Sequence, residues 1–376
     1  MEPDKIPLIA GLMIFAASML SLKLGVSVAI FEVLLGLAAA AFGLEAGDWM
    51  VYIAGFGGIV LTFLAGSEVD VKLLRENFRQ TALLSALSFL SPLAAGYLFC
   101  RFAAGWGHGA ALLAGIALSE TSLAVVYSVL TETGLNRSRT GKLLMACTFL
   151  TNTLTALALS LAFLKPDLYT LLFVGVSGIF LLFSGRFSAG FLSHPSISGK
   201  VIEPEIKYIF FVLLAFVYLA GLGAGQAMLP AFLFGLAMSG HFSTASGGAV
   251  KSRLRTVAYA FITPFFFIVA GMKVSLPALR EAAWMFAGLF LLRQLAKGAA
   301  VYFPARTLFR SSRGYSTLLM STGLTFGLMA ALFGLNAGIL DRARYSLLTG
   351  VLIASAVLPA FAAQRWFPPA EDEDMG

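Results

Sequence analysis

The chain has 376 residues, of which 59% are hydrophobic and 12% charged, and its formal net charge is +7. Soluble domains carry about 25% charged residues, so this composition excludes a soluble enzyme and a disordered protein. The basic residues form no tract, and we therefore expect no nucleic-acid partner. The apolar residues occur in long blocks rather than in the alternation of a β-barrel strand, which predicts an all-α polytopic membrane protein.

Thirteen apolar blocks come close to the length of about 20 residues that a helix needs to cross a bilayer. The ninth of them, bounded by Pro230 and Gly240, is the shortest. In chain order, we predict transmembrane helices over Ile6 to Leu22, Val26 to Leu44, Met50 to Gly66, Thr81 to Phe102, Gly109 to Leu130, Leu143 to Leu164, Leu168 to Ser184, Tyr208 to Gly225, Met228 to Gly240, Thr256 to Gly271, Ala282 to Ala305, Tyr315 to Leu340 and Tyr345 to Ala363.

The distribution of basic residues tests this number of spans, because cytoplasmic loops carry an excess of Lys and Arg. With the N-terminus outside, the inward loops hold 17 basic residues and the outward segments hold 7. One inward loop, before the tenth span, holds Lys251, Arg253 and Arg255. We therefore predict a protein of the cell inner (plasma) membrane with its N-terminus outside and its C-terminus cytoplasmic. Met1 to Lys5 lacks the basic start of a signal peptide, so we expect the first span to be retained.

The two halves of the chain match when they are compared at an offset of about 200 residues. Gly134 to Asn136 then falls on Gly334 to Asn336, and near an offset of 205 Ala65-Gly66 falls on Ala270-Gly271. The matches lie at the ends of corresponding spans that are an odd number of spans apart, which predicts inverted repeats, as in secondary transporters. We divide the chain into an N-terminal helix (1–25), a first repeat (26–164), linker helices (165–227), a second repeat (228–365) and a short acidic cytoplasmic tail (366–376).

Charged residues inside spans are functional candidates, because a charge at mid-bilayer is costly unless it is paired or hydrated. Glu120, Arg293 and Lys297 lie there, and Glu32 is a fourth residue that a place at the membrane boundary or in a helix contact explains equally well. Glu120 lies in a run of four polar residues, Ser119 to Ser122. Because a regular helix turns about 100° per residue, such a run cannot face one site, which predicts local unwinding.

The matching stretch of the twelfth span, Ser321 to Gly327, carries hydroxyls and glycines but no acid. It predicts a second broken helix, whose exposed backbone would come from Ser321, Thr322, Gly323 and Thr325. The alternative is that these small residues only let helices pack closely. Arg293 and Lys297, four residues apart, share one face of the eleventh span. Either their protonation changes during function, as lysine allows more readily than arginine, or they form a structural ion pair with Glu120.

Five stretches resemble the monovalent cation:proton antiporters of family 2, the Kef-type and NapA-like membrane components: Leu118 to Asn136, Lys142 to Thr155, Thr263 to Gly271, Lys297 to Arg306, and Leu319 to Asp341. The resemblance covers essentially the whole chain. It implies thirteen helices in the inverted-repeat NhaA/NapA-like fold, with two crossing discontinuous helices at spans five and twelve. It also implies a homodimer, with dimerisation helices and core helices in the first repeat, and an elevator-like exchange of Na⁺ or K⁺ for H⁺.

In that family the sixth span bears one or two adjacent aspartates, and the matching positions here are Thr151 and Asn152. We therefore expect Glu120 to bind cation and proton, with oxygen ligands from Asn152, Thr151, Ser119 and Thr121 and with Lys297 and Arg293 as charge partners. Asn152 is either natural or an introduced change from aspartate, and in the second case the chain would be a trapped form.

Two other functions are compatible with the sequence. An organic-anion carrier of the same fold would use Arg293, Lys297 and the helix N-termini of the broken spans. A transport-disabled homologue would act as a sensor or scaffold. No nucleophile with its base, metal constellation or phosphate loop is visible, so we expect no enzyme, no cofactor and no metal beyond the transported Na⁺ or K⁺. The expected partners are the cation, H⁺, the lipid bilayer and a second copy, and the short tail predicts no nucleotide-binding domain.

Overall fold

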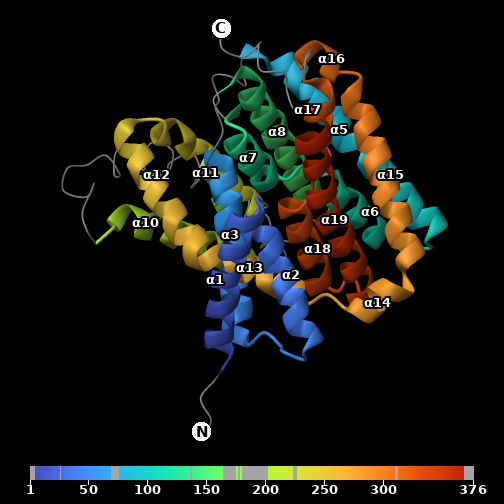
Figure 1. The fold of residues 1–376 in the computed structure, drawn as a ribbon. Coiled ribbons are helices and arrows are strands. Elements are labelled where there is room, and N and C mark those ends of the chain that lie inside the picture. Colours follow the sequence, from blue (N-terminus) through green and yellow to red (C-terminus); the bar gives the residue numbers. More distant parts are fainter. Residues whose placement is uncertain are drawn as a thin grey trace. The chain divides into compact units, whose positions relative to one another are not determined.

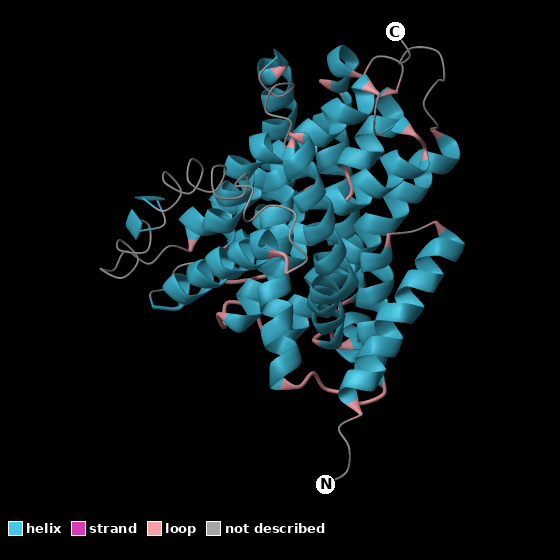
Figure 2. Cartoon of the chain, turned by 90° about the vertical axis from the view of Figure 1, so that its left-hand side faces the viewer, coloured by secondary structure: helices cyan, strands magenta, loops and turns pink. Residues whose placement is uncertain are grey.

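The computed structural model describes residues 5–25, 27–68, 76–135, 138–163, 175–176, 178–179, 202–222, 227–309 and 312–367. The regular structure of these residues is helical, as Figure 2 shows. Nine helices in the described part are long and apolar enough to cross a membrane. The expectation of an all-helical membrane protein is therefore confirmed.

The other four predicted spans differ from these nine for separate reasons. The second and ninth correspond to shorter apolar helices, Val28–Ala41 and Met228–Phe242. The eleventh corresponds to α15 (Ala283–Tyr302), which has 20 residues but carries Arg293, Gln294 and Lys297, and these lower its hydropathy. The seventh, Leu168 to Ser184, lies almost entirely outside the described residues, as do most of the linker and the acidic tail.

The contacts within the chain divide it into two units (Figure 1). Unit 1 comprises Met1–Gly47, Lys72–Thr155 and Phe267–Gly376, and unit 2 comprises Asp48–Val71 and Ala156–Phe266. Unit 1 contains α1 (Ile6–Leu24), α2 (Val28–Ala41), α5 (Phe78–Leu98), α6 (His108–Ser119), α7 (Leu123–Glu132), most of α8 (Arg139–Ala162) and of α13 (Thr263–Met272), α14 (Leu276–Glu281), α15, α16 (Ala305–Leu308), α17 (Arg313–Met320), α18 (Thr325–Asn336) and α19 (Arg342–Trp366). Unit 2 contains α3 (Asp48–Ser67), α10 (Pro204–Leu222), α11 (Met228–Phe242) and α12 (Ala245–Val257).

In unit 2, helices α3 and α11 pack at backbone distance because glycines lie at their contact. A methyl group on Gly66 would lie 2.1 Å from the Phe232 carbonyl oxygen, and one on Gly235 would lie 2.0 Å from that of Phe63. Small residues at such contacts let membrane helices approach closely. A core of Phe63, Phe216, Phe234 and other apolar side chains surrounds this contact.

In unit 1, helices α2 and α13 pack in the same way. A methyl group on Gly36 would lie 2.0 Å from the carbonyl oxygen of Ile268, and one on Gly271 would lie 2.0 Å from that of Val33. In each unit both helices contribute a glycine to the contact: Gly66 and Gly235 in unit 2, and Gly271 and Gly36 in unit 1. Gly66 and Gly271 are the pair that the predicted repeat aligns.

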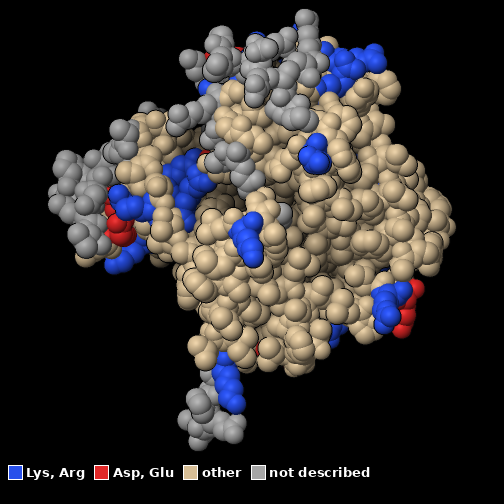
Figure 3. All heavy atoms as spheres, viewed as in Figure 1, with Lys and Arg blue, Asp and Glu red and all other residues tan. Residues whose placement is uncertain are grey.

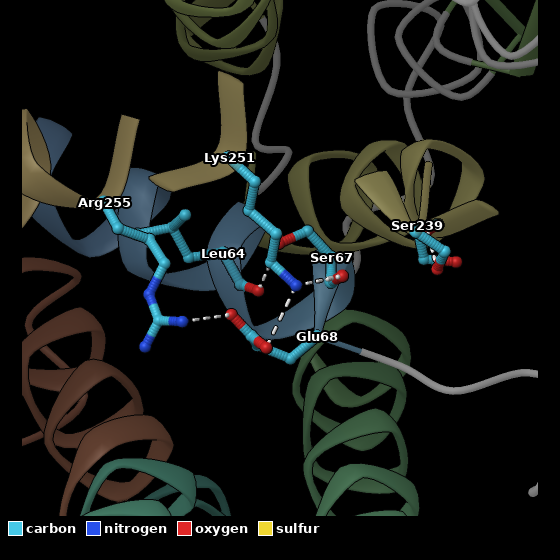
Figure 4. A network of polar contacts seen from close by, with 7 residues as sticks. Leu64, Ser67, Glu68, Ser239, Lys251 and Arg255 are labelled. Carbon is cyan, nitrogen blue, oxygen red and sulfur yellow. Dashed lines mark hydrogen bonds and ion pairs between the residues drawn. The ribbon is translucent and has the colours of Figure 1, made fainter. Parts of the chain in front are cut away.

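The segment before the tenth span was expected to be a loop, but it is helical, and Lys251 and Arg255 lie on α12. A π-helical turn (Ala258–Ile262) joins α12 to α13, and the candidate span runs from Gly247 to Met272. Figure 4 shows that both basic side chains pair with one carboxylate: Lys251 Nζ lies 3.0 Å from Glu68 Oε2, and Arg255 Nη1 lies 3.4 Å from Glu68 Oε1. Arg253 is also on this helix and pairs with Glu203 at 2.8 Å.

Many large apolar side chains of the described residues are exposed at the surface. On the face shown in Figure 3, most atoms belong to uncharged residues, and Lys and Arg lie in small separate groups. Helix α1 exposes Leu8, Leu12 and Phe15 by more than half of their area. Apolar side chains exposed along a whole helix are suited to contact with lipid.

Candidate functional site

The first helix interruption lies between α6 and α7. Helix α6 ends at Ser119, Glu120 adopts an extended conformation (φ −63°, ψ 159°), and α7 begins at Leu123. Ser119, Glu120, Thr121 and Ser122 are all fully buried. Non-helical backbone at membrane depth must find polar partners within the protein, so this segment needs groups from other helices.

The second interruption lies between α17 and α18, and it meets the first. The Thr121 hydroxyl donates to the Met320 carbonyl oxygen at 3.1 Å, and the Ser122 N–H donates to that of Thr322 at 3.4 Å. The hydroxyls of Ser122 and Thr325 lie 3.3 Å apart. The two discontinuous helices therefore cross at their breaks, and both breaks belong to unit 1.

Arg293 of α15 binds the backbone of both breaks. From the first break its guanidinium donates to the carbonyl oxygens of Leu118 at 2.8 Å and Glu120 at 3.1 Å. From the second it donates to those of Ser321 at 2.6 Å and Thr322 at 3.1 Å. Carbonyl groups at helix ends carry partial negative charge and lack helical partners. One buried cation thus satisfies four of them.

Gly323 provides the room for this arginine. A methyl group on Gly323 would lie 2.1 Å from Arg293 Nη2 and 3.4 Å from Glu120 Oε1. A real Cβ cannot approach a heavy atom so closely, so any other residue would displace the guanidinium or the chain. Gly323, which the sequence predicted to lie in a broken helix, therefore leaves the space that the Arg293 guanidinium occupies.

Lys297, one turn further along α15, binds the first break alone. Its Nζ donates to the Ser119 carbonyl oxygen at 2.6 Å and also to that of Glu120. Within the described ranges no ion pair joins the Glu120 carboxylate to Lys297 or Arg293. The expected pairing between these charges is therefore indirect, since the basic side chains hold the backbone around the acid.

The Glu120 carboxylate is fully buried at the crossing. Among the described residues neither of its oxygens has a hydrogen-bond partner. The backbone N–H groups of Leu324 and Gly327 point toward it from the start of α18, without completing hydrogen bonds of normal geometry. Burial opposes a negative charge here, and the helix N-terminus and the two nearby cations offset part of that cost. The carboxylate can accept a proton or a cation without first breaking a contact.

Asn152 and Thr151 lie on α8, which reaches the crossing through Thr148. The Thr148 hydroxyl lies 3.7 Å from the sulfur of Met320, and Asn152 follows one turn later on the same face. Both polar atoms of the Asn152 side chain are buried without a partner in the described part of the chain. Thr151 donates to the Cys147 and Thr148 carbonyl oxygens within its own helix. No hydrogen bond in the described ranges joins Asn152 to Glu120.

Two further observations concern residues outside the crossing. Glu32, which the sequence left between a boundary and a helix-contact position, is buried on α2. In the part of the chain that the structure describes, no three His, Cys, Asp or Glu side chains are grouped so that they could hold a metal ion. Sequence reasoning missed Met320, because its contacts use a carbonyl oxygen and a thioether. Its position just before Ser321 was the available signal.

The family model for the transmembrane sodium/hydrogen exchangers matches residues 9–364. The chain belongs to this family. The narrower resemblance to family 2 and to Kef-type components stays a prediction.

Curated relatives resemble the chain over most of both lengths. The protein named probable Na(+)/H(+) antiporter 3 of Methanocaldococcus jannaschii is 24% identical, covering 86% of this chain and 85% of that protein. The Na(+)/H(+)-K(+) antiporter GerN of Bacillus cereus is 23% identical, covering 90% and 89%. The Na(+)/H(+) antiporter of Enterococcus hirae is 26% identical, covering 91% and 92%. The names of these relatives are those of transporters.

A solved structure shares the fold. The sodium proton antiporter MjNhaP1 from Methanocaldococcus jannaschii superimposes with a TM-score of 0.74 at 15% identity, covering 97% of both chains. A second structure of that protein, at pH 8, gives a TM-score of 0.68 at 16% identity. At this identity the likeness shows the fold, and the chemistry has to be argued from the crossing itself.

Proposed function

We propose that this chain exchanges a monovalent cation, Na⁺ or K⁺, for protons, and that Glu120 binds the cation and the proton in turn. The observation that carries this proposal is the Glu120 carboxylate, fully buried at the helix crossing with both oxygens free of partners in the described residues. An ionised carboxylate at this depth is costly unless a proton or a cation neutralises it. The names of the relatives from Methanocaldococcus, Bacillus and Enterococcus support the same exchange.

Neutral oxygens near the crossing complete the proposed cation site. The hydroxyls of Ser119, Thr121 and Thr151 donate to backbone carbonyl oxygens, and each keeps lone pairs for a cation. Asn152 can add its amide oxygen but cannot carry a proton. Because Glu120 is the single carboxylate among these residues, one cation replaces one proton, and the exchange moves no net charge.

The contacts of the basic residues favour a cation over an organic anion as the substrate. Arg293 and Lys297 together donate to carbonyl oxygens of Leu118, Ser119, Glu120, Ser321 and Thr322. An anion would have to displace these bonds, which would leave helix-end carbonyl groups unsatisfied in a buried place. We therefore assign both basic residues to holding the breaks in place.

The wider architecture follows from the predicted repeat. We propose that residues 26–164 and 228–365 are inverted repeats, which the equivalent glycine contacts at Gly66 and Gly271 support. Transport would proceed by elevator-type alternating access in a homodimer of the plasma membrane. The N-terminus would lie outside and the C-terminus in the cytoplasm, as the distribution of Lys and Arg indicates.

The test is proton flux in proteoliposomes that contain a pH dye, with Na⁺, K⁺, Li⁺ or choline added outside. We expect Na⁺- or K⁺-dependent flux in the unmodified chain and none in Glu120→Gln. Glu45→Gln, an exposed acid in a loop, is the matched control and should exchange normally. Exchange that survives in Glu120→Gln would overturn the assignment. Flux only in Asn152→Asp would identify a disabled antiporter, and silence in every variant would favour the sensor or scaffold.

A further inference from the structure

Two arginines of unit 1 lie on aromatic rings where α15, α16 and α17 meet. The guanidinium carbon of Arg306, on α16, lies 5.5 Å from the centroid of the Phe303 ring. That of Arg313, the first residue of α17, lies 5.2 Å from the centroid of the Tyr302 ring. The two rings are neighbours, with centroids 6.1 Å apart. The guanidinium groups therefore belong to one cluster, and their contacts with the rings help to hold them in place.

Neither arginine of this cluster forms an ion pair in the described part of the chain. The ion pairs found there involve Lys251, Arg253, Arg255 and Arg344. Arg313 Nε is buried, and among the described residues it has no hydrogen-bond partner. A buried donor without an acceptor is costly, and the dipole of α17 disfavours a positive charge at its first residue. An anion bound at the cluster would offset both costs.

Exposed aromatic side chains lie beside the arginines, at the ends of two apolar helices. Tyr302 and Phe303 lie at the end of α15, and Trp366 and Phe367 lie at the end of α19. All four are exposed. The end of α19 contacts the start of α17, since a methyl group on Gly314 would lie 2.7 Å from Phe367 Cδ1. Tyr and Trp at the ends of membrane helices are typical of the level of the lipid headgroups, so we place the arginines at that level.

One face of α19 continues from this cluster as exposed apolar surface. Leu358, Phe361 and Arg365 follow one another at intervals of three and four residues, so they share a face of the helix. All three are exposed. The Phe361 ring contacts that of Trp366, with centroids 6.2 Å apart. This face combines apolar side chains with a third arginine at its end, as a molecule with acyl chains and an anionic headgroup requires.

We infer that Arg306, Arg313 and Arg365 bind the phosphate group of an anionic phospholipid whose acyl chains lie along the exposed face of α19. Guanidinium groups bind phosphate oxygens through paired hydrogen bonds and stay charged. A free phosphate ion would use the arginines but neither the aromatic side chains nor the apolar face. Figure 3 shows Lys and Arg side chains gathered near α16, at the upper right in the view of Figure 1.

The side of the membrane agrees with this ligand. In the proposed orientation this end of unit 1 faces the cytoplasmic leaflet, whose anionic lipids attract basic residues next to membrane helices. The site goes beyond the proposed exchange and does not rest on it, because lipid binding needs no transport.

Native mass spectrometry of the whole chain in detergent micelles measures lipid binding directly. The delipidated chain is titrated with phosphatidylglycerol, which is anionic, and with phosphatidylcholine, which carries no net charge. We expect the double variant Arg306→Gln, Arg313→Gln to bind phosphatidylglycerol at least about tenfold more weakly than the unmodified chain. Phosphatidylcholine should bind equally to both. Arg280→Gln is the matched control, because Arg280 is an exposed arginine of α14, at the opposite end of α15 from Arg306. It should bind like the unmodified chain.

Equal affinity of the unmodified chain and the double variant for phosphatidylglycerol would overturn the site. If the double variant does not fold, Arg306→Lys with Arg313→Lys supplies the second measurement. These lysines keep the charges but lose the paired hydrogen bonds, so phosphatidylglycerol should bind several-fold more weakly. Unchanged affinity in the folded lysine variant would count against the site.

Two further arms separate a lipid from other anions. Inorganic phosphate at the concentration of the lipid should not displace phosphatidylglycerol, and Trp366→Ala should weaken lipid binding. Displacement by phosphate, or full lipid affinity in Trp366→Ala, would identify a site for a free anion and overturn the lipid. Replacing the acids of the tail, Glu371 to Asp374, by their amides should leave the affinity unchanged. A rise in affinity would show that the tail occupies the arginines, and the lipid would then be wrong.

Discussion

The two breaks meet at one crossing, but they contribute different chemistry. The first break supplies the Glu120 carboxylate and three carbonyl oxygens that Arg293 and Lys297 bind, whereas the second supplies two carbonyl oxygens and the space at Gly323. Two segments that the predicted repeat aligns can therefore both be interrupted while only one of them carries a carboxylate. We therefore expect one set of mutations to disturb the backbone of the two breaks and another set to disturb ion binding at Glu120.

The largest effect should come from removing the group that the two breaks share. Arg293→Leu leaves four buried carbonyl oxygens without their donor, and we expect a loss of at least about 3 kcal/mol in unfolding free energy. Equilibrium unfolding in mixed micelles measures it. Lys297→Leu is the comparison within the same helix and should cost less, because it loses contacts to the first break alone. A larger loss for Lys297→Leu would mean that the first break carries the stability of the crossing.

A methyl group at the second break should disturb the first break through Arg293. In Gly323→Ala the new Cβ would lie 2.1 Å from Arg293 Nη2, which binds the Glu120 and Thr322 carbonyl oxygens. Losing these two bonds should cost about 2 kcal/mol and lower the exchange rate more than about tenfold. Gly298→Ala, on the helix that carries Arg293 and with open space around the new methyl group, should leave the rate unchanged. An active Gly323→Ala would show that the breaks work independently.

The contact between α6 and α18 should be sensitive to volume. In Gly327→Ala the new Cβ would lie 2.7 Å from the Ala117 carbonyl oxygen and 2.6 Å from Leu352 Cδ2. We expect a loss of about 1–3 kcal/mol in unfolding free energy, because neither neighbour can move without disturbing packed helices. Gly109→Ala in α6, whose methyl group would meet only Ile339 Cγ2 at 3.8 Å, is the control and should be neutral or stabilising. A neutral Gly327→Ala would mean that α6 and α18 are loosely packed.

The sequence predicted the interruptions because their signal is local. Four consecutive polar residues around Glu120 cannot face one direction in a helix, and Ser321 to Gly323 lack the apolar side chains of a regular span. The family model and the shared fold agree with the coarser prediction of an all-helical membrane protein. Span ends were less predictable. Lys251 and Arg255 were predicted to lie in a loop because basic residues gather at the ends of spans. They lie on helix α12 instead and pair with Glu68, which is far away in the sequence.

The partners of the basic residues could not be predicted from the sequence. Arg293 and Lys297 suggested an ion pair with Glu120, because the carboxylate is the visible opposite charge. Their actual partners are mostly carbonyl oxygens, which every residue has and which become available only where a helix breaks. The free-energy cost of leaving those carbonyl groups unpaired therefore determines where the Arg293 and Lys297 side chains lie. That cost cannot be seen in the sequence, because it arises only when the two breaks meet in the folded chain.

The smallest effect should come from the neutral cap of α7. The Ser122 hydroxyl accepts a hydrogen bond from the Val125 N–H at 3.4 Å and lies near Thr325, whereas α18 begins opposite the Glu120 carboxylate. Ser122→Ala should lower the unfolding free energy by about 1 kcal/mol, as the loss of an N-terminal cap does. Ser122→Thr keeps the hydroxyl and should restore stability. Proton flux at saturating cation should change little in either variant, because a neutral cap positions a helix without binding the ion. If Ser122→Ala abolished exchange at normal stability, the Ser122 hydroxyl would belong to the ion site together with those of Ser119 and Thr121.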